Sequence, residues 1–136
     1  MSEQRQSRPR PPCGAACAAA AICLLGFALR LYRIEAQSLW WDEAISLHLA
    51  TSTVGQILAD RAAHVHPPLY FLLLKGWVSV AGVSAFSARL SSTLANTALI
   101  ATAYAVGRRH AGRSTGLAAA LVTAGSALYV VYSQEV

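Results

Sequence analysis

Charged side chains are scarce in this sequence. Only 12% of the 136 residues are Asp, Glu, Lys or Arg, whereas 55% are hydrophobic. Because soluble domains carry about 25% charged residues, this composition argues against an ordinary soluble domain. We therefore expect an all-α membrane protein, and the length leaves room for only a few membrane-spanning helices.

Cysteines are also few, and their positions exclude two common uses. All three, Cys13, Cys17 and Cys23, fall in the first apolar run. They lack the spacing of a disulfide framework and have no histidine partners for a metal site. We interpret them as small apolar residues of a helix.

The sequence lacks a Gly-rich phosphate loop and an aromatic–basic face for nucleic acid. Its net charge is nevertheless +5, from 11 Lys and Arg against 6 Asp and Glu. The arginines stand in short clusters beside apolar segments, which is typical of charges that orient membrane helices. We therefore expect the lipid bilayer, and not nucleic acid, to be the partner of this basic chain.

Three apolar segments are predicted to span the membrane, at residues 13–31, 88–107 and 115–132. A basic tail, residues 1–12, precedes the first, and we expect Arg30 near its end to snorkel to the interface. A basic turn at 108–114 joins the other two, with Ser114 capping the last helix. A cleaved signal peptide is the alternative for the first segment, but no convincing cleavage site follows it.

Residues 32–87 are predicted to form a loop with short juxtamembrane helices. One helix is expected to begin near Ser38 or Asp42 and to end near Ala50. Another should begin after the capping-box sequence Thr53-x-x-Gln56 and end near Ala63. Neither is apolar enough to span a bilayer, but both have an apolar face that can lie on one.

A further helix is predicted at residues 69–82, after His66-Pro67-Pro68. Its 14 residues would cover only about 21 Å of the roughly 30 Å of hydrocarbon, so we expect an interfacial or re-entrant helix. With three spans, both basic clusters face the cytoplasm. The sequence thus predicts a multi-pass plasma-membrane protein with a cytoplasmic amino terminus. A four-span alternative would place the basic turn outside.

Asp42 and Glu43 are the first residues that suggest chemistry. As a structural pair, Asp42 would cap a helix and Glu43 would complement its dipole. As a functional pair, a carboxylate at the membrane surface can accept a proton from a hydroxyl or ligate a divalent metal. The preceding Trp40 and Trp41 favour a position at the headgroup level.

Several cations and one further acid complete the candidate site residues. His64 and His66 alternate in an extended segment, so both rings could face one ligand. His66, Lys75, Arg61 and Arg89 are candidates for phosphate binding, although a snorkelling role is simpler for Lys75. The three-span topology places Glu135 on the same outer side as Asp42.

Four short motifs occur in an order that resembles a known family. The series resembles the start of the GT-C membrane glycosyltransferases of the protein O-mannosyltransferase and aminoarabinose-transferase type (glycosyltransferase family 39-like), from about Leu31 onwards. The motifs are Leu39-Trp40-Trp41-Asp42-Glu43-Ala44, His66-Pro67-Pro68-Leu69-Tyr70-Phe71, Arg89-Leu90-Ser91-Ser92 and Tyr132-Ser133-Gln134-Glu135.

The resemblance implies an enzyme that transfers a sugar from a polyprenyl-phosphate donor to a protein, lipid or glycan acceptor at the outer membrane face. It implies a catalytic carboxylate at Asp42, supported by Glu43, and a donor-phosphate contact at His66. Glu135 would be a second acid at the outer face, so that Asp42 and Glu135 could together bind a divalent metal ion. No other cofactor is implied, and neither the sugar nor the acceptor is specified.

The place where the sequence ends leads to an alternative hypothesis. Members of the resembled family continue after Ser-Gln-Glu with Ala-Arg and further spans, whereas Val136 stands here. We therefore expect the amino-terminal part of such an enzyme. The alternative is a small non-enzymatic membrane protein or an inactive truncated remnant. A transporter fragment is weaker, because the spans contain almost no intramembrane charges.

Overall fold

The computed structural model describes residues 13–64 and 66–135, so the predicted basic tail lies outside them. Within these ranges the secondary structure consists of seven helices and no strand. The expected all-α membrane class is confirmed. The helices are α1 (Cys13–Leu31), α2 (Trp41–Thr51), α3 (Val54–Ala62), α4 (Pro68–Ala81), α5 (Ala85–Ala111), α6 (Arg113–Gly125) and α7 (Ala127–Tyr132).

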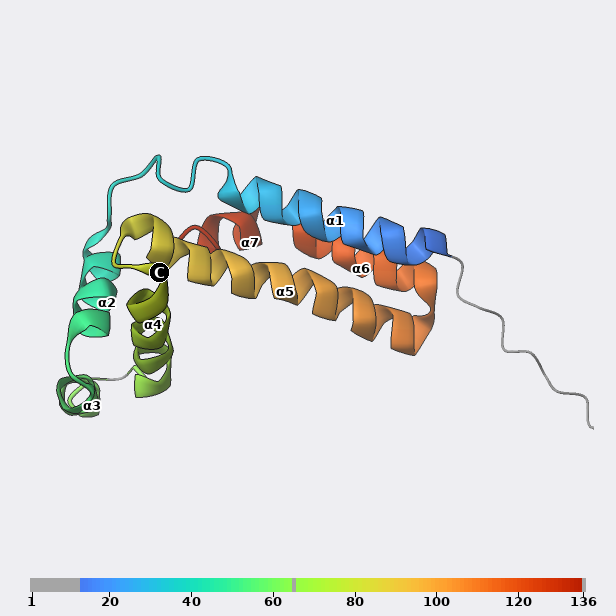
Figure 1. Ribbon diagram of the computed structural model, residues 1–136. Coiled ribbons are helices and arrows are strands. Elements are labelled where there is room, and N and C mark those ends of the chain that lie inside the picture. The colour runs from blue at the N-terminus through green and yellow to red at the C-terminus, as the bar shows by residue number, and fades with distance from the viewer. Residues whose placement is uncertain (1–12, 65, 136) are drawn as a thin grey trace, which may run out of the picture.

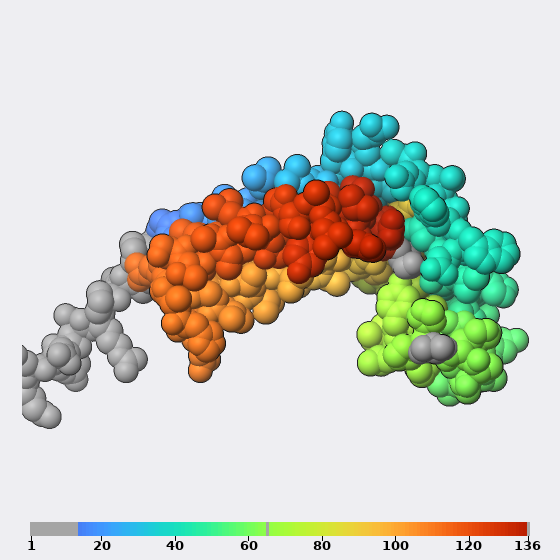
Figure 2. Space-filling view, turned by 180° about the vertical axis from the view of Figure 1, so that it is seen from behind, coloured from blue at the N-terminus to red at the C-terminus, as the bar shows by residue number. Residues whose placement is uncertain are grey.

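The helices form two groups. Helices α1, α5 and α6 run lengthwise beside one another, and α2, α3 and α4 gather at one end (Figure 1). We call the group of α1, α5 and α6 the long arm and the group of α2, α3 and α4 the end group. In the view from behind, α7 continues along the long arm from α6 (Figure 2). Between the groups, α4 and α5 meet at an angle of 120°. The long arm and the end group therefore run in different directions.

Glycine closes the hairpin between α5 and α6. Gly112 has a φ of 91°, which an L side chain rarely adopts, and its N–H bonds the carbonyl of Arg108. The predicted turn at 108–114 is thus too long, because α5 continues to Ala111. The expected cap at Ser114 is also wrong, since α6 already begins at Arg113.

The two helices of this hairpin pack closely at glycine. A Cβ added to Gly116 would lie 2.8 Å from the backbone oxygen of Tyr104 and 2.9 Å from the backbone nitrogen of Arg108. Because Gly116 has no side chain, the backbones of α5 and α6 can approach each other closely. Small residues have the same effect in pairs of membrane helices. Further along the arm, Ile100, Ala120 and Ala124 form a buried cluster.

Two expectations about the long arm are wrong, and both involve the buried side chain of Arg30. The single helix predicted at 115–132 is broken at Ser126, which has a ψ of 116°. Arg30 does not snorkel to the interface. It is fully buried and donates to the carbonyls of Thr123 (3.0 Å) and Ala124 (3.3 Å), and also to Gly26 in its own helix (2.9 Å). The carbonyls at the end of a helix lack intrahelical donors, and Arg30 supplies them.

Two small apolar clusters hold the end group together. Leu49, Ile57 and Phe71 join α2, α3 and α4. A second cluster joins α2 and α4 to the start of α5 and consists of Ala50, Leu74, Val78 and Ala88. The predicted capping box at Thr53 is present. The Thr53 side chain accepts a hydrogen bond from the backbone N–H of Gln56, and the Gln56 side-chain oxygen accepts one from the backbone N–H of Thr53.

Helix α1 is the described helix that is both long and apolar enough to cross a membrane. Only 17% of its apolar window, Gly14–Leu31, is buried within the protein, which is typical of a lipid-facing helix. Helices α4 and α5 meet the same criterion only as a bent pair. Ser, Thr and Asn side chains make α5 less apolar than α1. The number of spans and their orientation stay predictions.

Candidate active site

A buried ion pair anchors the first helix of the end group. The guanidinium of Arg89, at the start of α5, donates from Nη2 to Glu43 Oε2 at 2.6 Å and from Nε to Oε1 at 2.9 Å. The side chains of Arg89 and Glu43 are only 2% and 3% exposed. This bidentate geometry is the strongest form of an arginine–carboxylate contact.

The same two side chains also organise the segment that precedes α2. Arg89 donates to the carbonyls of Ile34 (2.8 Å), Gln37 (2.9 Å) and Ser38 (3.3 Å). Glu43 accepts from the backbone N–H of Trp40, the residue that caps α2 (3.2 Å). Arg89 and Glu43 therefore hold the acidic motif in place.

Asp42 has different surroundings from its neighbour. Its side chain is exposed, and it makes no hydrogen bond or ion pair with any residue in 13–64 or 66–135. Because Trp40 is the N-cap and Glu43 bonds its N–H, the capping role weighed for Asp42 is already filled. The carboxylate of Asp42 thus remains available to a ligand.

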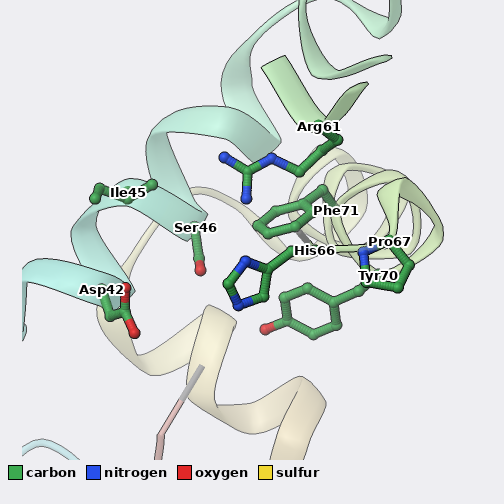
Figure 3. Close-up of a pocket in the computed structure, with 8 residues that line it drawn as sticks. All are labelled: Asp42, Ile45, Ser46, Arg61, His66, Pro67, Tyr70 and Phe71. Atoms are coloured by element: carbon green, nitrogen blue, oxygen red, sulfur yellow. The ribbon is translucent and has the colours of Figure 1, made fainter. Parts of the chain in front are cut away.

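Asp42 faces a cavity of about 250 Å³, which we call the Asp42–His66 pocket. In the close-up, Ser46 lies between Asp42 and His66, and the Tyr70 hydroxyl points toward the same space (Figure 3). The lining residues come from α2, α3, the following loop and α4: Asp42, Ile45, Ser46, Arg61, His66, Pro67, Tyr70 and Phe71.

Two polar side chains of this pocket, Tyr70 and Arg61, interact with neighbouring residues. Partial burial raises the pKa of the Tyr70 hydroxyl, and the Glu43 carboxylate adds to the rise. Tyr70 therefore stays protonated at neutral pH and can donate a hydrogen bond. Arg61 lies over the ring of Phe71, 4.6 Å from its centroid, and pairs with Asp60.

Glu135 shares a second cavity with the acidic motif. This acidic pocket, of about 270 Å³, is lined by Trp40, Asp42, Glu43 and Glu135. The structure thus brings together the carboxylates of two motifs that are far apart in the sequence. Asp42 lies between the two cavities, because it lines both.

The residues before Glu135 fix its position. The Ser133 carbonyl accepts from the Thr93 hydroxyl of α5 at 3.1 Å. The Gln134 amide donates to the carbonyls of Arg30 (3.0 Å) and Tyr32 (2.9 Å) at the end of α1. The Ser-Gln pair of the motif therefore ties the chain to two helices.

A metal site does not follow directly from these acids. In the described parts of the chain, no group of three or more His, Cys, Asp or Glu residues has the geometry to hold an ion. Glu43 is engaged by Arg89, which leaves Asp42 and Glu135 as oxygen ligands, whereas hard cations take about six. A metal at Asp42 and Glu135 stays a prediction.

Three predicted cations lie apart from this site or have other partners. Lys75 donates to the carbonyl of Ser52 at 2.7 Å and lines a different cavity. Arg89 is engaged by Glu43. His64 is turned back to the carbonyl of Asp60 (2.7 Å) and does not line the pocket with His66. Of the four residues predicted to bind phosphate, His66 and Arg61 line the Asp42–His66 pocket, whereas Lys75 and Arg89 do not.

Ser46 and Tyr70 are pocket residues that the sequence did not single out. Ser46 is four residues after Asp42, a spacing that puts both on one helix face. Tyr70 follows the His66-Pro67-Pro68 turn, which starts α4 and fixes its direction. Both signals are present in the sequence, but neither is specific without the fold.

Comparisons with known proteins address the carboxyl-terminal part of the chain. Residues 65–136, just over half of the sequence, match the family of dolichyl-phosphate-mannose-protein mannosyltransferases. No curated protein and no solved structure matches the chain. The matched segment contains His66, Arg89 and Glu135. Asp42 and Glu43 precede this segment, but the ion pair between Glu43 and Arg89 connects the acidic motif to it. The chain belongs to the dolichyl-phosphate-mannose-protein mannosyltransferase family.

Proposed function

We propose that this protein is, or forms part of, a membrane glycosyltransferase that moves a sugar from a polyprenyl-phosphate donor to an acceptor hydroxyl. The family match supports glycosyl transfer in general. The observation that carries the rest is the exposed Asp42 carboxylate, which shares a pocket with His66 of the matched segment. The family's name makes a mannosyl-phosphate polyprenol the first donor to try.

Asp42 acts in this proposal as the general base. The acceptor hydroxyl gives its proton to the Asp42 carboxylate as its oxygen forms a bond to the anomeric carbon. The bond between that carbon and the phosphate oxygen breaks, and its electron pair leaves on the phosphate. The products are an inverted glycoside and a polyprenyl phosphate. Positioned bases of this kind contribute about 10²- to 10⁴-fold to a rate.

The remaining site residues act around this step. His66 contacts the donor phosphate, and the protonated Tyr70 donates a hydrogen bond within the pocket. Glu43 and Arg89 act by positioning Asp42, since each is buried against the other. Lys75 takes no part, because it lines another cavity.

We propose three spans, with the sites on the outer side of the plasma membrane and a cytoplasmic amino terminus. The 120° bend supports α4 as a juxtamembrane helix, because α4 does not extend the direction of α5. Trp40 and Trp41 are 62% and 81% exposed, as suits side chains at the headgroup level. Arg108 and Arg109 then lie at the cytoplasmic end of α5.

Transfer from a defined donor tests the proposal. Membranes that contain the protein are given a radiolabelled mannosyl-phosphate polyprenol and a mixture of acceptor proteins, and labelled product is counted. We expect label above that of membranes without the protein, and its loss in Asp42→Asn. Glu35→Gln, which removes another exposed acid of the same loop, is the control and should transfer normally. Equal labelling by Asp42→Asn and the unchanged protein would overturn the catalytic assignment.

A further inference from the structure

One permanent cation of the Asp42–His66 pocket has no role in the proposed reaction. Arg61, in the last turn of α3, lines the pocket together with His66. Among the described side chains that line the pocket, Asp42 is the only acidic one. Arginine keeps its charge at every physiological pH, so Arg61 sets the positive side of this cavity.

The guanidinium of Arg61 is held rigidly. Its Nε donates to Asp60 Oδ2 at 2.8 Å, and Nη2 contacts the same oxygen. Its Cζ lies over the Phe71 ring, 4.6 Å from the centroid, and the side chain is only 8% exposed. An arginine fixed in this way loses little further conformational entropy when it binds a ligand.

One edge of this guanidinium is left for a ligand. Among residues 13–64 and 66–135, no hydrogen bond is made by Nη1 of Arg61. In the close-up, the guanidinium of Arg61 lies beside Ser46 and His66, and one of its terminal nitrogens points toward them (Figure 3). Two terminal nitrogens side by side form the fork that binds a phosphate through two parallel hydrogen bonds.

A purely structural role explains less of this arrangement. Arg61 could serve only to hold α3 on α4 through Asp60 and Phe71. The ion pair contributes little to stability, however, because its Asp60 side chain is 38% exposed to solvent. Ile57, fully buried against Phe71, already joins these helices. An apolar residue would do the same without placing a charge in the cavity.

We propose that Arg61 binds the phosphate of the lipid-linked donor, across the pocket from Asp42. This assignment rests on the proposed glycosyl transfer and deepens it. The charge on the phosphate oxygen rises as the bond to the sugar breaks, so a fixed cation opposite the base stabilises the leaving group. The cavity of about 250 Å³ lies just below the roughly 300–1,000 Å³ of pockets that enclose a drug-sized ligand. It suits a sugar phosphate, with the polyprenyl chain outside.

Kinetics of Arg61 variants separate binding from folding. In Arg61→Met we expect the KM for the donor to rise about 10- to 100-fold, because a hydrogen-bonded charge contact is lost. Arg61→Lys keeps the charge without the fork and should lie between Arg61→Met and the unchanged protein. The KM for the acceptor should not change. Arg109→Met, at the far end of α5, is the control for charge alone.

Asp60→Asn tests the structural explanation. This variant removes the partner of Arg61 but leaves its guanidinium on Phe71. If Arg61 only braces the helices, Asp60→Asn and Arg61→Met should behave alike. If Arg61 binds phosphate, Asp60→Asn should keep a donor KM within a few-fold of the unchanged protein.

Binding without turnover distinguishes this inference from the proposed function. Polyprenyl phosphate, the reaction product, is titrated into vesicles that contain each variant, and tryptophan fluorescence reports binding. We expect at least about tenfold weaker binding in Arg61→Met and intermediate binding in Arg61→Lys. Unchanged binding in both would overturn the role of Arg61, even if Asp42→Asn abolishes transfer. Weakened binding without any transfer by the unchanged protein would instead support Arg61 and reject the proposed function.

Discussion

At the scale of single residues, Asp42 and Glu43 are neighbours with opposite surroundings. Glu43 is buried against Arg89, whereas Asp42 is exposed and lines two cavities. The sequence located the acidic pair and linked it to transfer chemistry. It could not separate the two roles, because the partner that buries Glu43 lies 46 residues away.

Breaking the Glu43–Arg89 pair should destabilise the protein strongly. Glu43→Gln or Arg89→Met leaves one buried charge without its partner, which costs about 3–5 kcal/mol of unfolding free energy. The double variant should lose clearly less than the sum of the two single losses, since neither charge remains. Denaturant unfolding of the detergent-solubilised protein measures all three. Strictly additive losses would show that the pair is not coupled.

The pKa of Asp60 offers a second check at the residue scale. A hydrogen bond from Arg61 holds the pKa of the Asp60 carboxyl below its ordinary value. A carboxyl whose pKa is lowered by folding stabilises the fold above its unfolded pKa, and this stabilisation disappears as the pH falls through the folded pKa. Carboxyl ¹³C NMR titration should therefore give a low midpoint for Asp60, and Arg61→Met should raise it. A midpoint unchanged by Arg61→Met would contradict the contact.

At the scale of helices, local signals in the sequence predicted most starts and ends. Pro67 and Pro68 at the start of α4, and the Thr53–Gln56 capping box of α3, mark helix starts through neighbouring residues alone. The break between α6 and α7 was missed. Gly125 and Ser126 are a pair of the kind found at kinks, but the donor that stabilises the break, Arg30, lies 94 residues from Ala124. Contacts over such distances cannot be read from a single sequence.

Removing Arg30 should weaken the long arm. In Arg30→Met the buried carbonyl of Ala124 and the partly buried carbonyl of Thr123 lose their donor, which should cost about 1–3 kcal/mol of unfolding free energy. Thermal unfolding in detergent measures the loss. Arg30→Lys, which can still reach one carbonyl, should lose less. No change in either variant would show that the break does not depend on Arg30.

Close packing of α5 on α6 should make Gly116 intolerant of larger side chains. Gly116→Val places its Cβ within contact distance of backbone atoms of α5, which cannot move aside as a flexible side chain can. We expect a loss of at least about 1–3 kcal/mol of unfolding free energy. Gly76→Ala, where a Cβ meets nothing within 4 Å, is the matched control and should be neutral or slightly stabilising. Equal effects of the two substitutions would contradict this packing.

At the scale of the whole molecule, the chain separates a lengthwise bundle from an end group that contains the Asp42–His66 pocket (Figure 1). The apolar runs and short loop helices predicted this division from composition and length. The cavities themselves required the fold, because Asp42, Arg61 and His66 come from α2, α3 and the next loop. Glu135 reaches the acidic pocket only through contacts to α1 and α5.

Cysteine labelling tests the proposed orientation. In a variant without the native cysteines, Ala111→Cys at the end of α5 should resist a membrane-impermeant maleimide added from outside. Gly55→Cys, on the exposed surface of α3, should react. Both sites should react once the membrane is opened. Labelling of Ala111→Cys from outside would reject the three-span arrangement.

The central claim is that Asp42 is the base of a glycosyl transfer. The most direct measurement is kcat and KM for a mannosyl-phosphate polyprenol in the unchanged protein and in Asp42→Asn, under conditions where transfer is rate-limiting. A base that acts only in the transition state should lower kcat and kcat/KM together, by about 10²-fold or more, and leave KM unchanged. An unchanged kcat, or a loss confined to KM, would contradict the claim.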